Sequence, residues 1–148
     1  MLGAMSGPQP GTVARARATL ADVDYRVEMQ AAPGHVIHAD EPPAMGGAGT
    51  APGPYDLVLT GLAACTVITL RMYEQRKHWD LGAISVELDL ERGDDLTERV
   101  HRRVWVEGAD AEQLARLGEI ADRTPVTLTL ARGMAITTEI AAAPPAQR

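Results

Sequence analysis

The stretch 54–76 reads PYDLVLTGLAACTVITLRMYEQR and contains the most apolar part of the chain. Fourteen uncharged residues, from Leu57 to Leu70, lie between Asp56 and Arg71. A bilayer span needs about 20 such residues, so this run is too short to cross a membrane. A helix that is apolar on nearly every face belongs inside a protein. The sequence therefore predicts a buried central helix over 54–76.

The start of this helix is marked by its residue types. Gly53 can serve as the N-cap, Pro54 suits the first helical position, and Asp56 adds negative charge to the first turn. Small residues at 61, 63 and 64 would let another backbone approach closely. They lie just before Cys65, the only cysteine of the chain. We expect a core helix that carries one thiol.

The composition restricts the possible classes of protein. With 148 residues the chain has the size of one domain, and we assign 12–140 to it, with tails at 1–11 and 141–148. The net charge is −6 and the basic residues are scattered, which argues against a nucleic-acid partner. One cysteine excludes an internal disulfide and fits a reducing compartment. The N-terminus lacks the pattern of a signal peptide, so a cytoplasmic location is expected, with no membrane partner.

The segment before the central helix has the period of strands. Alternating side chains predict half-buried strands over 13–20 and 25–30, a turn at 22–24, and a short third strand over 35–39. Pro33-Gly34 has the chemistry of a type II turn. The natural arrangement is an antiparallel meander.

Two features of this region suggest ligands, and we assign none to either. His35 and His38 lie three residues apart on a strand, so they point to opposite faces, and no thiolate cluster joins them. The loop 41–53, EPPAMGGAGTAPG, leads to a helix N-terminus but lacks the lysine and glycine pattern of phosphate loops. We expect surface histidines, no metal, no cofactor, and a flexible loop that covers the central helix.

The second half of the chain predicts a hairpin, a helix and a closing strand. Residues 83–91 alternate cleanly, and 97–107 return with valines 100, 104 and 106 on one face and charged residues on the other. Asp110 and Gln113 form a capping pair for an amphipathic helix that Pro125 stops. The run TLTL at 127–130 fits either a strand or a continuing helix, and 134–140 suggests a last strand. The order βββ-α-ββ-α-β implies an α+β fold with an antiparallel sheet.

The residues alone allow two interpretations of the role of Cys65. A free cysteine usually behaves as a small buried hydrophobe. A catalytic cysteine needs its thiolate form, which a nearby cation or a helix N-terminus stabilises. Cys65 lies about three turns into its helix, so a cation from elsewhere would be required. Candidates are Arg15, Arg17, Arg26 and Arg71; Arg71 projects from a different helix face, and spacing does not choose among the others.

Two stretches resemble a known family. Residues 40–79, DEPPAMGGAGTAPGPYDLVLTGLAACTVITLRMYEQRKHW, are similar to the core of the OsmC/Ohr family of osmotically and peroxide-inducible proteins. Residues 120–130, IADRTPVTLTL, resemble the family's second-helix segment, where a Cys-Pro pair is typical. The resemblance implies an intertwined homodimer, in which two antiparallel sheets wrap a pair of central helices and the active sites lie at the subunit interface.

The resemblance also implies thiol-dependent reduction of organic hydroperoxides. Cys65 matches the peroxidatic cysteine, whose oxidation gives a sulfenic acid that a second cysteine resolves. Thr124 occupies that second position in this chain. Asp56 is a near match for the family's acidic residue, which falls at or beside Tyr55, and Arg26 is the candidate for its cation.

Two functions therefore follow for an OsmC-like stress-response protein. The first is a one-cysteine peroxidase of the oxidative stress response, recycled by an external thiol. The alternative is a non-enzymatic family member that binds a small apolar ligand at the dimer interface. An accessible Cys65 beside an arginine favours the first, and a buried, inert thiol favours the second.

Overall fold

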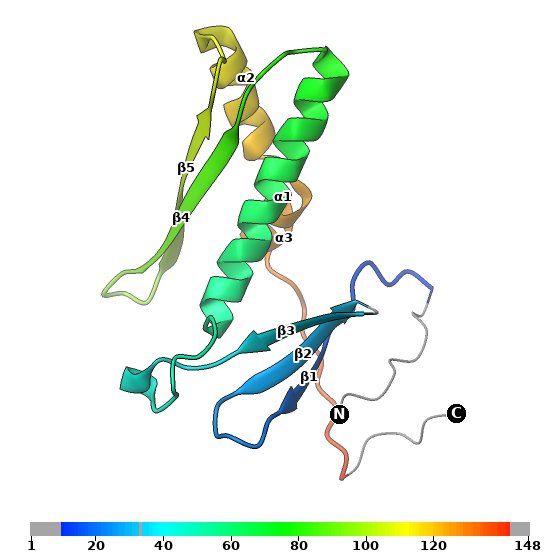
Figure 1. Ribbon diagram of the computed structural model, residues 1–148, viewed down its shortest axis with the longest axis vertical. Helices are drawn as coiled ribbons and strands as arrows, with labels where there is room; N and C mark the ends of the chain where they lie inside the picture. Colours follow the sequence, from blue (N-terminus) through cyan, green and yellow to red (C-terminus); the bar gives the residue numbers. More distant parts are fainter. Residues whose placement is uncertain (1–9, 33, 143–148) are drawn as a thin grey trace. The chain divides into compact units, whose positions relative to one another are not determined.

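The computed structural model describes residues 10–32 and 34–142 and has an α+β fold with antiparallel strands, as the sequence predicts. In chain order the elements are β1 (Arg17–Leu20), β2 (Val27–Ala32), β3 (His35–Ala39), the 3-10 helix η1 (Pro43–Met45), α1 (Pro54–Lys77), β4 (Ile84–Arg92), β5 (Glu98–Val106), α2 (Ala111–Ala121) and α3 (Pro125–Arg132) (Figure 1).

The chain forms two compact units, which we describe one at a time. Among the described residues, the first unit comprises 10–57 and 138–142, and the second comprises 58–137. Helix α1 begins in the first unit and continues through the second. The single domain over 12–140 stays a prediction, and the expected tails lie largely outside the described residues.

The first unit contains the predicted antiparallel meander. Strands β1, β2 and β3 are neighbours in that order, and β1 pairs with β2 from Arg17 opposite Gln30 to Leu20 opposite Val27. The first strand is shorter than predicted, because residues 13–16 have no partner strand in the register and Val13 is fully exposed. The second strand begins after Tyr25, whose φ of 69° belongs to the turn. Gly34 has a φ of 82°, and Pro33 of the predicted type II turn lies outside the described residues.

We expected the loop 41–53 to be flexible, but hydrogen bonds hold it in place. The Asp40 side chain, 2% exposed, accepts from the backbone N–H of Glu41 at 2.8 Å and from that of Thr50 at 2.9 Å. The hydroxyl of Thr50 donates to the same carboxylate at 2.7 Å. The loop closes where the Asp40 N–H donates to the Pro52 carbonyl at 3.1 Å. A buried aspartate therefore organises this loop.

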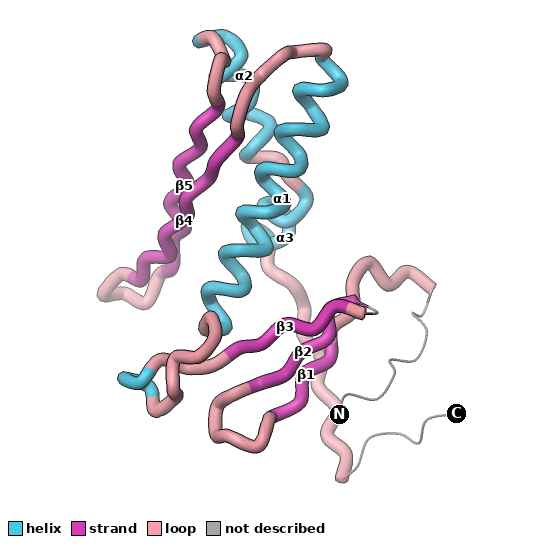
Figure 2. Tube along the Cα trace, viewed as in Figure 1, coloured by secondary structure: helices cyan, strands magenta, loops and turns pink. Residues whose placement is uncertain are grey.

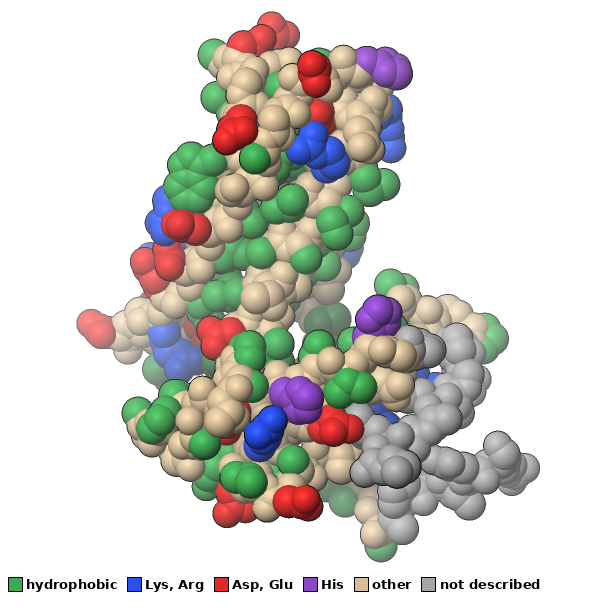
Figure 3. Space-filling view, viewed as in Figure 1, with side chains coloured by type: hydrophobic (Ala, Val, Ile, Leu, Met, Phe, Trp, Pro, Cys, Tyr) green, Lys and Arg blue, Asp and Glu red, His purple; other side chains and the backbone are tan. Residues whose placement is uncertain are grey.

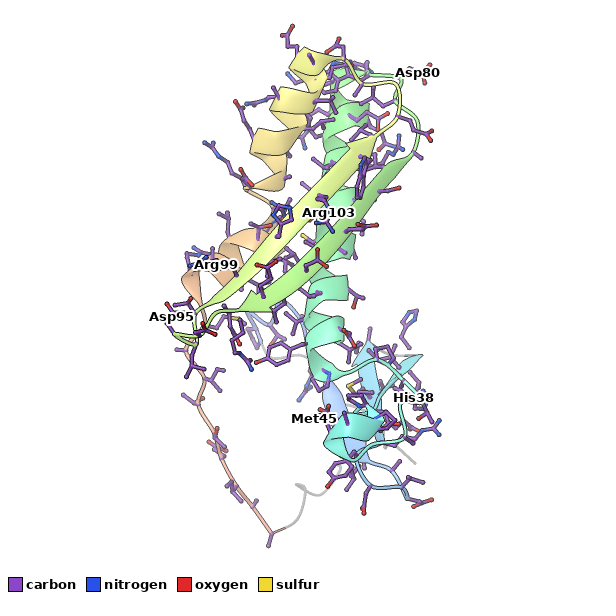
Figure 4. The ribbon with its side chains drawn as sticks, turned by 90° about the vertical axis from the view of Figure 1, so that its left-hand side faces the viewer. His38, Met45, Asp80, Asp95, Arg99 and Arg103 are labelled. Carbon is purple, nitrogen blue, oxygen red and sulfur yellow. The ribbon has the colours of Figure 1, made fainter. Side chains whose placement is uncertain are left out.

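Strands β4 and β5 form the predicted hairpin in the second unit. Their register runs from Ile84 opposite Val106 to Arg92 opposite Glu98. Along β4 the residues at 84, 86, 88 and 90 are half-buried and those between them are exposed. The outer face is charged, and Arg103 there donates to Asp89 at 2.7 Å and to Glu87 at 3.2 Å. Figure 4 views this face with Arg99 and Arg103 labelled.

Helix α1 is buried along one stripe rather than on all sides. The stripe consists of Leu62, Thr66, Leu70 and Glu74, one residue per turn. Leu70 is fully buried and forms a core cluster with Leu81, Leu117 and Ala121. Apolar residues on another face, Val58, Ile68 and Met72, remain 47%, 58% and 56% exposed. Figure 3 shows hydrophobic side chains reaching the surface of this unit.

Length and composition alone would let α1 cross a membrane. Its packing is that of a core helix in a domain with a hairpin and two further helices. Arg71 and the buried Glu74 pair at 2.5 Å on this helix, and Arg71 also donates to the Gly82 carbonyl at 2.6 Å. These contacts tie α1 to the segment that leads into β4.

Helices α2 and α3 meet at Thr124. The predicted capping box of α2 is present: the Gln113 N–H donates to the Asp110 carboxylate at 2.8 Å, and the Asp110 N–H donates to the Gln113 side chain at 2.9 Å. After α2 ends, Pro125 opens α3 with Thr124 as its N-cap residue. The ambiguous TLTL run is therefore helical, because proline at the first position favours a helix start.

The predicted closing strand over 134–140 is wrong. Residues 133–140 have no regular secondary structure and are drawn as loop in Figure 2. Ile136 and Ile140 are 85% and 94% exposed. Alternation shows which side chains a strand would bury, but a strand forms only where another edge offers hydrogen bonds. The segment pairs with no other strand of the described chain.

Candidate functional site

Cys65 lies in the middle of α1 and is partly exposed. Its Sγ is 3.9 Å from the hydroxyl oxygen of Thr69, one turn further along the helix. The thiol is therefore not enclosed in the apolar core. Partial exposure is one of the two conditions for a reactive cysteine, and the other is a positively charged environment.

The next residue, Thr66, belongs to the buried stripe of α1 and is completely shielded from solvent. Its hydroxyl donates to the Leu62 carbonyl at 2.8 Å, within its own helix. The same oxygen accepts a hydrogen bond from Nη1 of Arg102 at 3.2 Å. A guanidinium group from β5 is thereby attached to the helix turn that carries Cys65.

Arg102 occupies the inner face of β5 between Val100 and Val104, opposite Leu88 on β4. Its side chain is only 13% exposed. Besides Thr66, Nη1 donates to the hydroxyl of Thr127 at 3.0 Å, and Nη2 donates to the Asp122 carboxylate at 3.1 Å. One arginine therefore joins α1, the end of α2 and α3.

The remaining member of this group is Thr124, which is fully buried. Its hydroxyl lies 2.7 Å from that of Thr127, and either can be the donor. The Thr127 hydroxyl also reaches the Ala121 carbonyl at 3.3 Å. We call Thr66, Arg102, Asp122, Thr124 and Thr127 the Arg102 network. It connects the residue after Cys65 with the position where the family typically has its second cysteine.

Sequence reasoning missed Arg102, although a signal was present. In a strand, side chains two residues apart share a face, so the inward valines at 100 and 104 place residue 102 inward too. An arginine on an otherwise aliphatic inner face is unusual, because burying a charge is costly unless it is hydrogen-bonded. A charged residue in an otherwise apolar alternation could therefore have indicated a buried arginine with hydrogen-bond partners.

The other predicted site residues lie in the first unit, whereas Cys65 lies in the second. The Asp56 carboxylate accepts from the Gly53 N–H at 2.9 Å, at the start of α1. Arg26 is half-buried in the turn between β1 and β2, and its N–H donates to the Val23 carbonyl at 3.1 Å. Their roles toward Cys65 remain proposals.

A cavity of about 600 Å³ opens elsewhere in the second unit, between the end of α1 and α2. Tyr73 and Trp79 stack edge to face there at 5.7 Å, and Arg116 donates to the Tyr73 hydroxyl at 2.8 Å. Neither Cys65 nor the Arg102 network lines it. Over residues 10–32 and 34–142, no three histidine, cysteine or acidic side chains gather as metal ligands would.

These features define an α+β protein with an accessible thiol on its longest helix. The sequence model of the OsmC-like protein family matches residues 47–139, which include α1, the hairpin, α2 and α3. The chain belongs to this OsmC-like family. Comparison with curated protein sequences finds no match.

Solved structures share the fold. An OsmC-like protein from Mycoplasma pneumoniae is 18% identical, with 82% of this chain and 89% of that chain covered and a TM-score of 0.66. An organic hydroperoxide resistance protein, OsmC, from Legionella pneumophila is 19% identical over 81% and 90% of the two chains, with a TM-score of 0.59. An organic hydroperoxide resistance protein from Elizabethkingia anophelis is 17% identical over 79% and 86%, with a TM-score of 0.60.

Proposed function

We propose that this protein reduces organic hydroperoxides with Cys65 as the peroxidatic thiol and an external thiol as the reductant. The observation that carries the proposal is the partial exposure of Cys65, the one thiol of the chain, in the middle of α1. A thiol of a packing residue would be enclosed in the core. Hydroperoxide resistance in the names of two structural neighbours supports the choice of substrate.

The proposed reaction has two stages. The Cys65 thiolate attacks one oxygen of the hydroperoxide, the O–O bond breaks, and an alcohol leaves after taking up a proton. Cys65 is then a sulfenic acid. One external thiol condenses with it to give a mixed disulfide and water, and a second thiol releases Cys65 and carries away the disulfide. No other cysteine exists in the chain, so the reductant must come from outside, as it can in the cytoplasm.

Two further residues have proposed roles that follow from the family resemblance. Asp56 stands where the family has its acidic residue, and its carboxylate already orders the first turn of α1. Arg26 is the proposed counterpart of the family's cation from the early strands. We expect Asp56→Asn and Arg26→Met to slow hydroperoxide reduction without changing the unfolding transition.

We also propose that the protein is a homodimer whose copies pack along the outer stripe of α1, defined by Val58, Ile68 and Met72. These side chains are roughly half exposed, and contiguous apolar surface of this kind marks an interface. Gly61, on the same helix, would allow a second backbone to come close, since nothing lies within 4 Å of its missing side chain. A stable interface of this type buries at least about 1,600 Å².

The dimer is tested by sedimentation velocity at micromolar concentration. Ile68→Glu places a charge in the proposed interface, so it should shift the protein toward the monomer. Val23→Glu is the matched control, because Val23 is similarly exposed at 56% in the turn between β1 and β2. A folded wild-type monomer at these concentrations would refute the proposal.

The activity is tested by intact-mass spectrometry after one equivalent of cumene hydroperoxide. The wild type should gain oxygen at Cys65, and Cys65→Ser should stay unmodified. With dithiothreitol in excess, the wild type should consume the hydroperoxide repeatedly. If Cys65 remains unmodified under these conditions, the peroxidase proposal fails and the ligand-binding function is favoured.

A further inference from the structure

The C-terminal end of α1 has a backbone conformation that places Trp79 against Tyr73. His78 follows the last helical residue with a φ of 56°, in the left-handed region. Its N–H donates to the Gln75 carbonyl at 3.1 Å, and the Trp79 N–H donates to the Glu74 carbonyl at 3.2 Å. These two bonds form a Schellman motif, in which the second residue after a helix packs back on its last turns. Trp79 thereby meets Tyr73 edge to face, with ring centroids 5.7 Å apart.

This aromatic pair is a fixed part of the fold. Glycine is the usual residue at the left-handed position of the motif, because a side chain is strained there. The chain keeps the motif with His78 at that position. Both rings also pack against the buried cluster that includes Leu70 and Leu117. The end of α1 therefore presents a preformed aromatic wall.

Together with one face of α2, the aromatic pair lines the cavity of about 600 Å³ at this end of the second unit (Figure 1). Residues 112, 115, 116 and 119 of α2 line it, and residues three or four apart share a helix face. Sites for small molecules have volumes of roughly 300–1,000 Å³ and combine apolar walls with a few polar groups. The cavity has both the size and the lining of such a site.

Most polar groups of this lining have partners within the protein. Asp110 and Gln113 bond to each other in the capping box of α2. Arg116 donates to the Tyr73 hydroxyl at 2.8 Å and pairs with the Glu119 carboxylate at 2.5 Å. These groups shape the cavity, and their charges are already matched.

Lys77 and Glu112 are the two charged lining residues that differ. Over residues 10–32 and 34–142, neither side chain has a hydrogen-bond or ion-pair partner. The Lys77 ammonium lies over the Tyr73 ring, 5.7 Å from its centroid, a distance at which a cation is attracted to the ring face. Glu112 lies in the first turn of α2. The cavity therefore offers a cation from α1 and a carboxylate from α2 beside an aromatic wall.

We propose that this cavity binds a small zwitterion with an aromatic side chain, the chemistry of a free aromatic amino acid. The ligand's carboxylate pairs with Lys77 and its ammonium with Glu112. Its ring packs against Trp79 in the edge-to-face or offset geometry that aromatic pairs prefer. A ligand with a single charge would leave one of the two protein charges unmatched. Because Cys65 does not line the cavity, this site is independent of the proposed peroxidase function.

The test uses L-phenylalanine as the probe and the fluorescence of Trp79 as the signal. The chain has two tryptophans, and Trp105 lies on the outer face of the hairpin, 49% exposed. Trp105→Tyr therefore leaves Trp79 as the reporter. Phenylalanine should change its emission along a saturating curve with a Kd of about 1 mM, as suits a ligand of this size. An emission that shows no saturation would overturn the proposal.

Two analogues of phenylalanine test whether both charges are recognised. Phenylacetate lacks the ammonium, and phenethylamine lacks the carboxylate. Each should bind about fivefold more weakly than phenylalanine, because one partly exposed ion pair is lost. Equal affinity for the three compounds would mean that only the ring is recognised, and this would contradict the proposal.

Two variants assign each charge to its residue. Lys77→Met should abolish the preference for phenylalanine over phenethylamine and keep the preference over phenylacetate, and Glu112→Gln should do the reverse. Arg76→Met is the matched control: Arg76 precedes Lys77 in the last turn of α1 but does not line the cavity, so the wild-type preferences should remain. Circular dichroism checks that each variant is folded. Wild-type preferences in both Lys77→Met and Glu112→Gln would overturn the assignment of the site.

Discussion

The two units each contain a charged side chain that is shielded from solvent and held by threonine hydroxyls. In the first unit it is Asp40, 2% exposed, and in the second it is Arg102, 13% exposed. Asp40 accepts two backbone N–H groups and the Thr50 hydroxyl. Arg102 donates to two neutral hydroxyls and to a carboxylate in solvent.

The difference shows two ways of stabilising a charge that is shielded from solvent. Backbone N–H groups carry fixed partial charge and favour the carboxylate form, and the hydrogen bonds from Thr50 lower the pKa of Asp40 below its ordinary value. That charge is used entirely to close the loop 41–53. Arg102 closes no loop; its guanidinium donates to side chains of α1, of α3 and of the end of α2, and so holds these elements together.

The largest effect on the free energy of unfolding is expected from a substitution that disrupts the Asp40 loop. In Gly47→Ala the new Cβ would lie 1.9 Å from the Glu41 carbonyl oxygen and 2.8 Å from an Asp40 carboxylate oxygen. Because a backbone group must move, we expect a loss of about 3 kcal/mol in the free energy of unfolding. Urea denaturation measures it.

Gly118→Ala is the control for this substitution. Nothing lies within 4 Å of the Cβ position in α2, so alanine should be neutral or stabilise the helix by about 0.5–1 kcal/mol. Equal effects of the two substitutions would mean that the Asp40 loop is not packed as described.

The next largest effect on the free energy of unfolding is expected from a substitution that removes one hydrogen bond of Arg102. Thr127→Val keeps the shape of the side chain but removes the hydroxyl that accepts from Arg102. A buried donor without a partner costs about 1–2 kcal/mol in the free energy of unfolding. Thr129→Val, on the same helix, is the control, since its hydroxyl donates to the Pro125 carbonyl of its own helix. A loss no larger than in the control would show that Arg102 does not depend on Thr127.

A smaller effect is expected from acid. Because the pKa of folded Asp40 is below its ordinary value of 3.8, its stabilising contribution is complete above that pH and is lost as the pH falls through the folded pKa. The free energy of unfolding should therefore decrease below about pH 4 in the wild type and less steeply in Asp40→Asn.

Two variants sharpen this measurement. Hydrogen bonds from Thr97 also lower the pKa of Asp95, so Asp95→Asn is measured in parallel to separate the two carboxylates. Arg102→Met should keep the acid dependence of the wild type, since the Asp40 loop is intact in it. An unchanged acid slope in Asp40→Asn would contradict the assignment of this dependence to Asp40.

The smallest effect on stability, but a qualitative effect on chemistry, is expected for Thr124→Cys. The new thiol would replace the hydroxyl that bonds to Thr127 and would restore the family's second cysteine. After one equivalent of hydroperoxide the variant should lose two hydrogens as a disulfide forms with Cys65, whereas the wild type gains oxygen. A disulfide requires the two Cα atoms to come within about 7 Å. A variant that only gains oxygen would show that residues 65 and 124 do not meet.

Sequence patterns predicted the elements whose signals are local. The helix over 54–76 was predicted from a proline at its start and an apolar run, and α1 ends one residue later. The structure also confirmed three other predictions from local patterns: the hairpin, the capping box of α2 and the antiparallel meander. The prediction of a strand over 134–140 was wrong. A strand pairs only with the edge of another strand, and the pattern of a single segment does not show whether such an edge is available.

The amino-acid sequence by itself determined the family, the helix that carries Cys65 and the absence of a second thiol, since these depend only on residue identity and local propensity. Tertiary structure decided which stripe of α1 is buried and which arginine is hydrogen-bonded to that stripe. Thr66, Arg102 and Thr127 are far apart in the chain, and only packing of β5 and α3 against α1 unites them. Hydrogen bonds between distant residues follow from that packing, and the periodicity of a single element cannot reveal them.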